Sequence, residues 1–517
     1  MARHVGLVCP PWLIQQWERP GLPGRKPWPT TVLVALWVMR FRGEGIRRRA
    51  AVREAKNNAQ WRAALREKWT DETPGKRVVA RFERFLLRRD PRTGMPRYLQ
   101  LFEHIGRVCM DAGVLGKRPV WAMDSTPMWC FGAVLDTTRQ LGDGVRSLAS
   151  EWARASGSTV EQLSTDWGCP LRRAKSTKGW LSIDWSDPVA RAEALDKLAQ
   201  VALDIASRVR SRVETVRANK RKGLLRRCRN LARVVSQDLE VDEEGRLVVA
   251  KRVAAQRLVS VTDPEARHGR KSRSVTFNGF KLHVLGDVVS GFMVAACVTP
   301  GNVHDSAPAC RLIERAKGLV ESIERVLGDT AYGAARLRHV VDGLADVQLL
   351  APSPMGRTLA GRLGKQDFEV ELETNTSTCP GGVTVAQRSW SFSQEHGVKV
   401  PVFKWTAQTC AGCPLRDACM GDAKGGKRVL LHPYESELRA AREAWEAPEV
   451  RADCRTRSQC ERRVHQLTRH GGRRARTWGL GPAQLQAHTI AIGCNLDLLA
   501  RRLAAGEGGG LTRSVCG

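Results

Sequence analysis

Two aspartates stand at the ends of short apolar segments that are typical of buried strands. Asp124 follows the run PVWAM, and Asp329 follows the run VLG. A carboxylate at the end of a buried strand is unfavourable unless a cation pairs with it, so neighbouring arginines give both residues a structural interpretation. Two such carboxylates at adjacent strand ends would repel each other, and a divalent metal relieves that repulsion. Hard oxygen ligands favour Mg²⁺ or Mn²⁺, and a pair of these ions can activate water and stabilise a leaving oxygen in phosphoryl transfer.

The chain as a whole is strongly basic. Its 517 residues contain 84 Lys and Arg against 53 Asp and Glu, which gives a formal net charge of +31, and 42% of the residues are hydrophobic. The hydrophobic share excludes wholesale disorder, and the charge favours a polyanionic partner, of which nucleic acid is the first candidate. We expect no membrane association, because no apolar run approaches the ~20 residues of a spanning helix. We also expect no secretory signal, because the opening segment has no continuous apolar stretch. The sequence predicts a cytoplasmic nuclease, polymerase or DNA strand transferase.

Two segments concentrate the positive charge. Residues 208–233 carry eleven Lys or Arg and one acid, and residues 455–476 carry eight Arg and one acid. A solvated helix face usually carries both signs, so the imbalance favours contact with DNA phosphates over an ordinary solvated face. We predict that both segments lie along double-stranded DNA, the first through Arg226, Arg227 and Arg229.

Several blocks of the sequence resemble the DDE transposases of bacterial insertion sequences. These blocks are WAMDSTPM, TDPEARHGRKSRSVTFNGFKLHV, TPGNVHD, VLGDTAYG and CRTRSQCERRVHQLTRHGGRRAR, and together they span nearly the whole chain. The nearest match is the branch with an InsH-like helical N-terminal domain. The resemblance implies an RNase H-like catalytic core that cuts and joins DNA ends, using two Mg²⁺ ions held by Asp, Asp and Glu. For such a protein we expect association with the bacterial nucleoid and a homodimer or higher oligomer on DNA.

The resemblance assigns catalytic and metal-binding roles to three residues. Asp124 in MDST matches the first aspartate of the family, and Asp329 in GDTAYG matches the second. The third carboxylate of the family lies in a helical Tyr-x2-Arg-x3-Glu-x6-Lys signature, to which Arg457 and Glu461 correspond. From the residues alone, Glu461 is equally a surface glutamate paired with an arginine on its own helix.

This chain departs from the signature at two positions that hold DNA phosphates in the family. Cys454 replaces the tyrosine, and Thr468 replaces the lysine, although Arg469 follows directly and is a candidate for the same contact. His304 in NVHD is a further candidate for contact with DNA or for orienting a ligand. A helix cap by Asp305 is the simpler interpretation of that motif.

Four of the 15 cysteines form a cluster. Cys410, Cys413 and Cys419 follow a C-x2-C-x5-C pattern, and Cys379 precedes them in TCPGG. Four thiolates between Gly and Pro turns suit one structural Zn²⁺ ion, with His396 or His432 as an alternative to Cys379. The other interpretation is that they are reduced, free cysteines in a loop. The remaining cysteines are scattered, as expected in a reducing compartment.

The order of the expected elements predicts an α/β protein with an RNase H-like core. We expect a helical DNA-binding domain at residues 1–118, in which Thr30 or Thr31 caps a helix, and a core at residues 119–352 and 436–504. The core contains a helical insertion at 130–258, a strand pair at 275–299 with a turn at 287–291, a helix at about 305–320 and a parallel strand at 347–352. Residues 353–435 form a small cysteine-bearing β/zinc insertion, and residues 505–517 are a disordered tail.

Two functions of different classes follow. The first is a transposase that binds the terminal inverted repeats of its element and catalyses metal-dependent DNA cleavage and strand transfer. The second is a transposase-derived DNA-binding protein with impaired catalysis, which the departures at Cys454 and Thr468 favour. The presence of all three carboxylates favours the first, and the helical N-terminal domain and long insertions disfavour a host repair nuclease.

Overall fold

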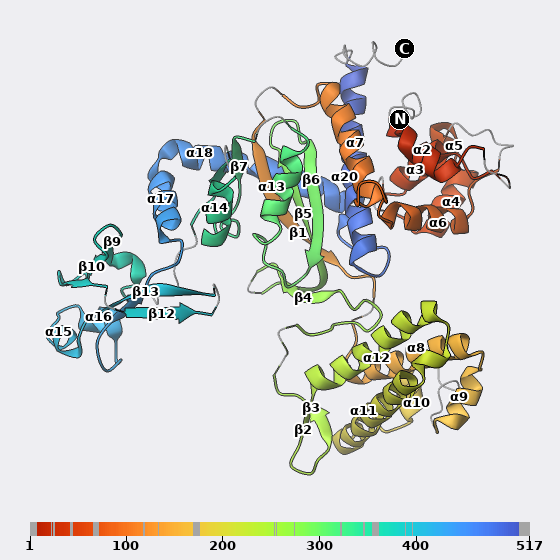
Figure 1. The fold of residues 1–517 in the computed structure, drawn as a ribbon, viewed down its shortest axis with the longest axis horizontal. Coiled ribbons are helices and arrows are strands. Elements are labelled where there is room, and N and C mark those ends of the chain that lie inside the picture. The colour runs from red at the N-terminus through yellow and green to blue at the C-terminus, as the bar shows by residue number, and fades with distance from the viewer. Residues whose placement is uncertain are drawn as a thin grey trace.

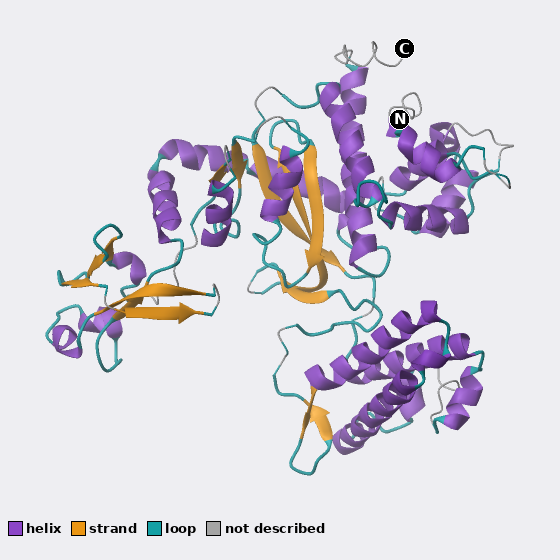
Figure 2. Ribbon diagram, viewed as in Figure 1, coloured by secondary structure: helices purple, strands orange, loops and turns teal. Residues whose placement is uncertain are grey.

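The computed structural model of the chain describes residues 8–21, 23, 26–41, 45–65, 72–116, 119–132, 134–168, 176–252, 254, 256–272, 274–320, 323–344, 347–353, 361–387, 389–394 and 397–505. These residues form a mixed α/β protein with a central sheet, surrounding helices, a helical bundle and a small β-rich unit (Figures 1 and 2). The predicted α/β class is confirmed. The predicted disorder of the tail concerns residues 506–517, which lie outside the described residues, as does His396.

The central sheet has six strands, and its first strand has an antiparallel neighbour on one side and a parallel neighbour on the other. The strands are β1 (Trp121–Trp129), β4 (Arg267–Arg270), β5 (Thr276–Asp287), β6 (Met293–Pro300), β7 (Arg325–Leu327) and β8 (Gln348–Leu350). β5 pairs antiparallel with β1, β4 and β6, whereas β7 pairs parallel with both β1 and β8. The predicted strand pair with its turn at 287–291 and the predicted parallel strand at 347–352 are confirmed.

The first strand lies where the sequence predicted a buried strand, at residues 119–128, but Asp124 does not end it. β1 begins at Trp121 and continues past Asp124 to Trp129. It continues because β5 pairs with it along its whole length, from Trp121 opposite Asp287 to Trp129 opposite Gly279. Its parallel pairing with β7 stops at Ala122. Asp124 therefore lies just past the point where β1 loses its parallel neighbour.

A helix covers the backbone of the edge strand β6. The side-chain amide of Asn495, on α20 (Leu480–Ala504), donates to the Met293 carbonyl and accepts from the Met293 N–H, both at 2.9 Å. Gln484, three turns earlier, makes the same pair of bonds to Val298 at 2.7 and 3.0 Å. Buried edge groups need such partners, because an unpaired N–H or C=O away from water is costly. α20 thus runs beside β6 and closes that edge of the sheet (Figure 1).

The N-terminal part is helical, as predicted, and packs on the same core as the sheet. Its helices are α2 (Pro11–Glu18), α3 (Thr30–Met39), α4 (Arg48–Asn57), α5 (Ala59–Leu65), α6 (Lys76–Leu87) and α7 (Arg97–Asp111). The predicted cap at Thr30 or Thr31 is wrong, because Pro29 precedes the first turn and no side chain of α3 caps it. Instead the Glu18 carboxylate accepts from the backbone N–H and the hydroxyl of Thr30, at 2.6 and 2.7 Å.

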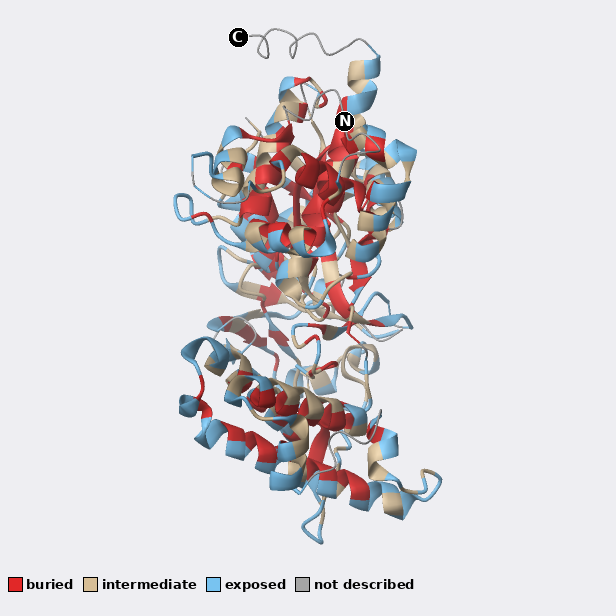
Figure 3. Cartoon of the chain, turned by 90° about the vertical axis from the view of Figure 1, so that its right-hand side faces the viewer, coloured by how far each residue is buried: buried red, intermediate tan, exposed pale blue. Residues whose placement is uncertain are grey.

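The segment after β1 forms a bundle with a core of its own. Its elements are α8 (Thr137–Ser156), α9 (Val160–Asp166), α10 (Thr177–Leu181), α11 (Pro188–Ser211), α12 (Ala218–Asp238) and the hairpin of β2 (Leu239–Val241) and β3 (Leu247–Val249). Figure 3 shows the buried residues of this bundle apart from those of the sheet and its helices. Within the described residues, none of the helices has the length and apolar character that crossing a membrane requires.

The remaining elements belong to the sheet or to the small unit. Five helices pack against the sheet or against one another beside it. They are α13 (Ala309–Lys317), α14 (Ala335–Asp342), α17 (Glu435–Glu446), α18 (Pro448–Thr456) and α19 (Ser458–Leu467). The unit contains β9 (Glu369–Glu371), β10 (Thr376–Thr378), β11 (Thr384–Ala386), β12 (Ser389–Ser393), β13 (Val398–Lys404), β14 (Arg428–Leu430), α15 (Ala407–Ala411) and α16 (Arg416–Met420). Its strands form two three-stranded antiparallel sheets.

Candidate active site

The register of two parallel strands brings Asp124 and Asp329 together. Ala122 on β1 stands opposite Leu327 on β7, which is the last residue of that strand. Each aspartate follows its paired residue by two positions, so both carboxylates lie just past the point where the parallel pairing of β1 and β7 stops. The Asp124 carboxylate accepts from the Ser125 N–H at 2.7 Å, and that of Asp329 accepts from the Ala331 N–H at 2.9 Å.

The third predicted carboxylate reaches this strand end on α19. Cys460 of that helix is buried against Ala122 and Leu327, and its Sγ lies 3.7 Å from the Ala122 carbonyl oxygen. One turn before α19, Cys454 packs on the same apolar cluster and its thiol lies 3.4 Å from the Leu350 carbonyl oxygen. These apolar contacts lay the helix across the ends of β1, β7 and β8, with Glu461 directly after Cys460.

The charges of Asp329 and Glu461 act on Asp124. Burial raises the pKa of Asp124 to about 6. The N–H of Ser125 and the Arg457 guanidinium lower that pKa, whereas the negative charges of Asp329 and Glu461 raise it. Electrostatic effects of this kind require proximity. The structure therefore brings together Asp124, Asp329, Glu461 and Arg457, four residues selected from distant parts of the sequence.

Glu461 is the solvent-exposed member of this group of carboxylates. Its side chain is 60% exposed, and its Oε1 lies 3.3 Å from Nη2 of Arg457, four residues earlier. The ion pair considered from the sequence is therefore present, in the same place as the carboxylate cluster. Across the described residues, no three His, Cys, Asp or Glu side chains already stand where they could hold one metal ion. The donor set nevertheless fits a hard divalent cation, because a buried carboxylate with a raised pKa and two further carboxylates nearby need positive charge to ionise together.

Tyr332 belongs to this site, although it was not among the residues predicted from the sequence. Its hydroxyl is buried and has no hydrogen-bond partner among the described residues. Burial raises the pKa of the phenol, and the charges of Asp305, Asp124 and Asp329 raise it further. The ring folds back from the turn that Asp329 begins, where Tyr332 N–H donates to the Asp329 carbonyl at 2.9 Å. The available signal was its place in the GDTAYG block, three residues after Asp329.

The NVHD motif has a structural role that differs from the expected one. Asp305 does not cap α13, which begins at Ala309 after Pro308. Its carboxylate accepts instead from Nζ of Lys281 on β5, at 2.9 Å. His304 is exposed, and its Nδ1 lies 2.8 Å from the Ser306 hydroxyl. The strand lysine outcompetes the helix N-terminus because it offers the carboxylate a full positive charge.

The end of α19 carries the departures from the family signature. The Thr468 hydroxyl donates to the His465 carbonyl at 2.8 Å, so it is used within its own helix. Arg469 is exposed in the π-helical turn Thr468–Gly472 that follows. Gly471 within that turn has φ +93, a conformation that favours glycine. Arg469 is therefore an exposed cation at this end of the helix.

The arginines predicted to bind DNA on α12 do not share one environment. Arg226 and Arg229 are exposed. Arg227 turns toward α8, where Nε lies 3.1 Å from the Ser147 hydroxyl and Nη2 lies 3.6 Å from the Glu151 carboxylate. The structure therefore separates two solvent-facing arginines from one that connects two helices of the bundle.

The four clustered cysteines lie in the β-rich unit, away from the carboxylates. All four are free thiols and half-buried. His432, which the sequence offered as an alternative zinc ligand, does not line the pocket that the cysteines share, and its Nδ1 accepts from the Tyr434 N–H at 3.1 Å. His396 lies outside the described residues.

One family comparison bears on this site. Residues 378–500 match the family model described as a transposase DDE domain. The matched segment begins at the cysteine-bearing unit and includes α19 with Glu461, whereas Asp124 and Asp329 precede it. No match is found to a curated protein or to a solved structure.

Proposed function

From the match of residues 378–500, which supports a DDE transposase, we propose that the protein cleaves and joins DNA ends by metal-dependent phosphoryl transfer. One observation carries the proposal: Asp124 and Asp329 each follow the last residue pair of two adjacent parallel strands by two positions, and Glu461 and Arg457 lie within electrostatic range of Asp124. Three acidic side chains that meet in an otherwise basic chain are consistent with cation binding rather than with ordinary surface pairing. We further propose that the mixed sheet is an RNase H-like core.

Asp124, Asp329 and Glu461 would hold Mg²⁺ or Mn²⁺, two ions in all. When bound, these ions supply an activated water and stabilise the leaving oxygen. The protein residues would orient the ions and balance their charge. Asp124 would provide oxygens from β1, Asp329 from the turn directly after β7, and Glu461 from α19. Arg457, one turn from Glu461, is suited to position the reacting phosphate, because a guanidinium donates in a planar fork that matches phosphate oxygens.

Double-stranded DNA is the partner that the charge favours. We propose that the terminal inverted repeats contact the helical N-terminal part, the exposed arginines Arg226 and Arg229, and Arg469 beside the scissile phosphate, with His304 as a further contact. Arg227, directed at Glu151, supports the bundle that carries the first two. Cleavage and joining of two ends further suggest a homodimer or higher oligomer on DNA.

The test is cleavage of a duplex that carries the terminal inverted repeat of the element, with purified full-length protein and added Mg²⁺. We expect Asp124→Ala, Asp329→Ala and Glu461→Ala each to abolish cleavage while specific DNA binding is retained. Glu446→Gln is the matched control, because Glu446 is an exposed carboxylate on α17, outside the cluster. Near-normal Mg²⁺-dependent cleavage by any one of the three alanine variants removes that residue from the site.

The alternative function, a DNA-binding protein with impaired catalysis, draws on Cys454 and Thr468. Neither side chain is free to hold a phosphate in this fold, because the first packs on the apolar cluster and the second bonds within its own helix. Specific binding of the terminal repeats without cleavage, in Mg²⁺ and in Mn²⁺, is the result that this alternative predicts. Cleavage that depends on all three carboxylates excludes it.

A further inference from the structure

The β-rich unit has a small hydrophobic core for its length. Six buried side chains make up this core: Phe368, Val370, Phe403, Trp405, Val429 and Leu431. Two separate three-stranded sheets and two five-residue helices surround it. Short elements that bury so little apolar surface usually need a further cross-link, such as a disulfide or a bound metal.

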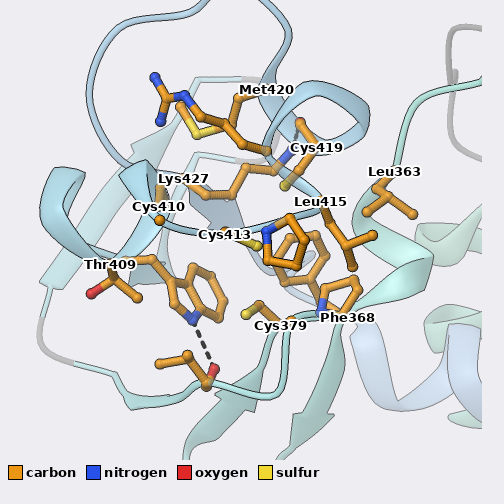
Figure 4. Close-up of a pocket in the computed structure, with 17 residues that line it drawn as sticks. Leu363, Phe368, Cys379, Thr409, Cys410, Cys413, Leu415, Cys419, Met420 and Lys427 are labelled. Atoms are coloured by element: carbon orange, nitrogen blue, oxygen red, sulfur yellow. Dashed lines mark hydrogen bonds between the residues drawn. The ribbon is translucent and has the colours of Figure 1, made fainter.

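Four thiols line one pocket beside this core. A cavity of about 200 Å³ has Cys379, Cys410, Cys413 and Cys419 in its wall, together with Phe368 and Trp405 (Figure 4). The thiols come from three segments that the fold brings together. Cys379 begins the turn between β10 and β11, Cys410 and Cys413 lie on and just after α15, and Cys419 lies on α16.

A glycine lets two of these sulfurs approach from different segments. A Cβ atom on Gly381 would lie 3.1 Å from Sγ of Cys413 and 3.7 Å from Sγ of Cys379. A side chain at this position would therefore crowd the Cys413 sulfur and would contact the Cys379 sulfur. The neighbouring Gly382 has φ +81, which allows the tight turn in which its N–H donates to the Cys379 carbonyl at 2.8 Å. The CPGG sequence thus shapes a turn that presents the Cys379 thiol to the others.

These cysteines differ from those that fill the cores. Seven described cysteines are buried in apolar surroundings, namely Cys9, Cys109, Cys130, Cys228, Cys297, Cys460 and Cys494. The four in the unit are half-buried around a cavity and are not joined in disulfides. Two cations line the same cavity, Arg416 and Lys427, and Nζ of Lys427 donates to the Cys419 carbonyl at 2.7 Å. Their charge offsets the negative charge that four thiolates around one divalent ion retain.

We propose that Cys379, Cys410, Cys413 and Cys419 bind one structural Zn²⁺ ion that closes this cavity and holds the two sheets and the two short helices of the unit together. Zinc is the divalent ion that four thiolates in a tetrahedron favour. Because no three described ligands already stand in position for one ion, binding draws the sulfurs inward, a shift that α15 and α16 can make as single short turns. This zinc site does not depend on the proposed DNA cleavage and joining.

The first experiment is metal analysis of the full-length protein purified without chelator. We expect one zinc per chain in the wild type, and a loss of at least tenfold in bound zinc in Cys413→Ser and in Cys419→Ser. Cys310→Ser is the matched control, because Cys310 is a half-buried free cysteine on α13, outside the unit, and this variant should retain one zinc. A wild-type protein without zinc, whose four thiols react freely under native conditions, overturns the proposal.

A second measurement covers variants that fail to fold. Cobalt added to metal-stripped wild-type protein should give the intense thiolate-to-metal charge-transfer band of a four-thiolate site, and zinc should displace it. Chelation should make residues 361–431 the first segment cut by limited proteolysis, since such sites contribute directly to folding. Absence of the charge-transfer band, or a disulfide among these cysteines in the non-reduced protein, contradicts the site. Both measurements are independent of DNA cleavage, so their failure is distinguishable from failure of the proposed function.

Discussion

Arg457 forms an ion pair with Glu461, Nη2 to Oε1 at 3.3 Å, and the same guanidinium lowers the pKa of Asp124. One side chain on the helix therefore acts on a carboxylate of its own helix and on a carboxylate of the sheet. This arrangement explains how an exposed glutamate on a helix can belong to a site whose other carboxylates lie on β1 and directly after β7. It also makes Arg457 the most informative position to change.

Replacing Arg457 by alanine should lower the cleavage rate by about 10- to 100-fold and weaken DNA affinity much less, because a misplaced phosphate costs rate rather than binding. It should also move the acidic limb of the pH–rate profile toward higher pH, because the positive charge that lowers the Asp124 pKa is gone. Arg457→Lys should restore the position of that limb without restoring the full rate. Single-turnover cleavage and a binding isotherm measure both effects.

Arg462→Ala is the control, because Arg462 is exposed on the same helix. If Arg457→Ala and Arg462→Ala have equal effects on rate and affinity, Arg457 is an ordinary phosphate contact.

Stability should depend on the ionisation of Asp124. Its pKa of about 6 in the fold exceeds the ordinary value of 3.8, so the folded chain binds more protons than the unfolded chain between these values. The contribution of Asp124 to stability is therefore fully present below about pH 4 and lost as the pH rises through 6. Asp124→Asn removes the buried charge, so without metal the variant should be more stable than the wild type at pH 8, with the difference vanishing near pH 4.

Denaturant unfolding in chelator at pH 4 and pH 8 measures this difference. Mg²⁺ should stabilise the wild type at pH 8 and leave Asp124→Asn unaffected, and wild-type cleavage should fall at acidic pH as Asp124 becomes protonated. A variant that is less stable than the wild type at pH 8 in chelator contradicts the assigned burial of this charge.

Tyr332→Phe should separate stability from activity. The hydroxyl is buried without a described partner, so its removal should leave the free energy of unfolding unchanged or raise it by about 1 kcal/mol. If the hydroxyl serves the assembled site, cleavage should fall several-fold and the Mg²⁺ concentration for half-maximal rate should rise. Tyr98→Phe, a buried tyrosine of α7, is the control. If the Mg²⁺ concentration for half-maximal rate is unchanged in Tyr332→Phe, the Tyr332 hydroxyl has no role in metal binding and the residue is purely structural.

The DNA contact of α12 should reside in Arg226 and Arg229. Replacing both by alanine should flatten the log–log dependence of DNA affinity on salt by about 2, since each phosphate contact contributes about 0.9. Arg227→Ala should leave this slope unchanged and instead lower the stability of the bundle by about 0.5 kcal/mol, because Arg227 pairs with Glu151 across two helices. If Arg227→Ala flattens the salt dependence as much as the double replacement of Arg226 and Arg229 does, these roles are wrong. They are also wrong if the double replacement leaves the salt dependence unchanged.

Much of the site was predictable because its signals are local. Asp124 and Asp329 each interrupt an apolar run, and such an interruption is visible in a few residues. Glu461 is the only acid in a long arginine-rich segment. The errors concern partners distant in sequence: Thr30 is bonded to Glu18 rather than capping its own helix, and Asp305 is paired with Lys281.

The sequence alone determined which residues carry charge, which segments are apolar and which side chains belong to the motifs. The tertiary structure alone decided that Ala122 stands opposite Leu327, that Cys460 packs α19 against that pair, and that Tyr332 buries its hydroxyl without a described hydrogen-bond partner. It also separated Arg227 from Arg226 and Arg229. The physical reason is that strand register and helix docking are set by the total burial of many apolar side chains, a quantity that no short segment contains.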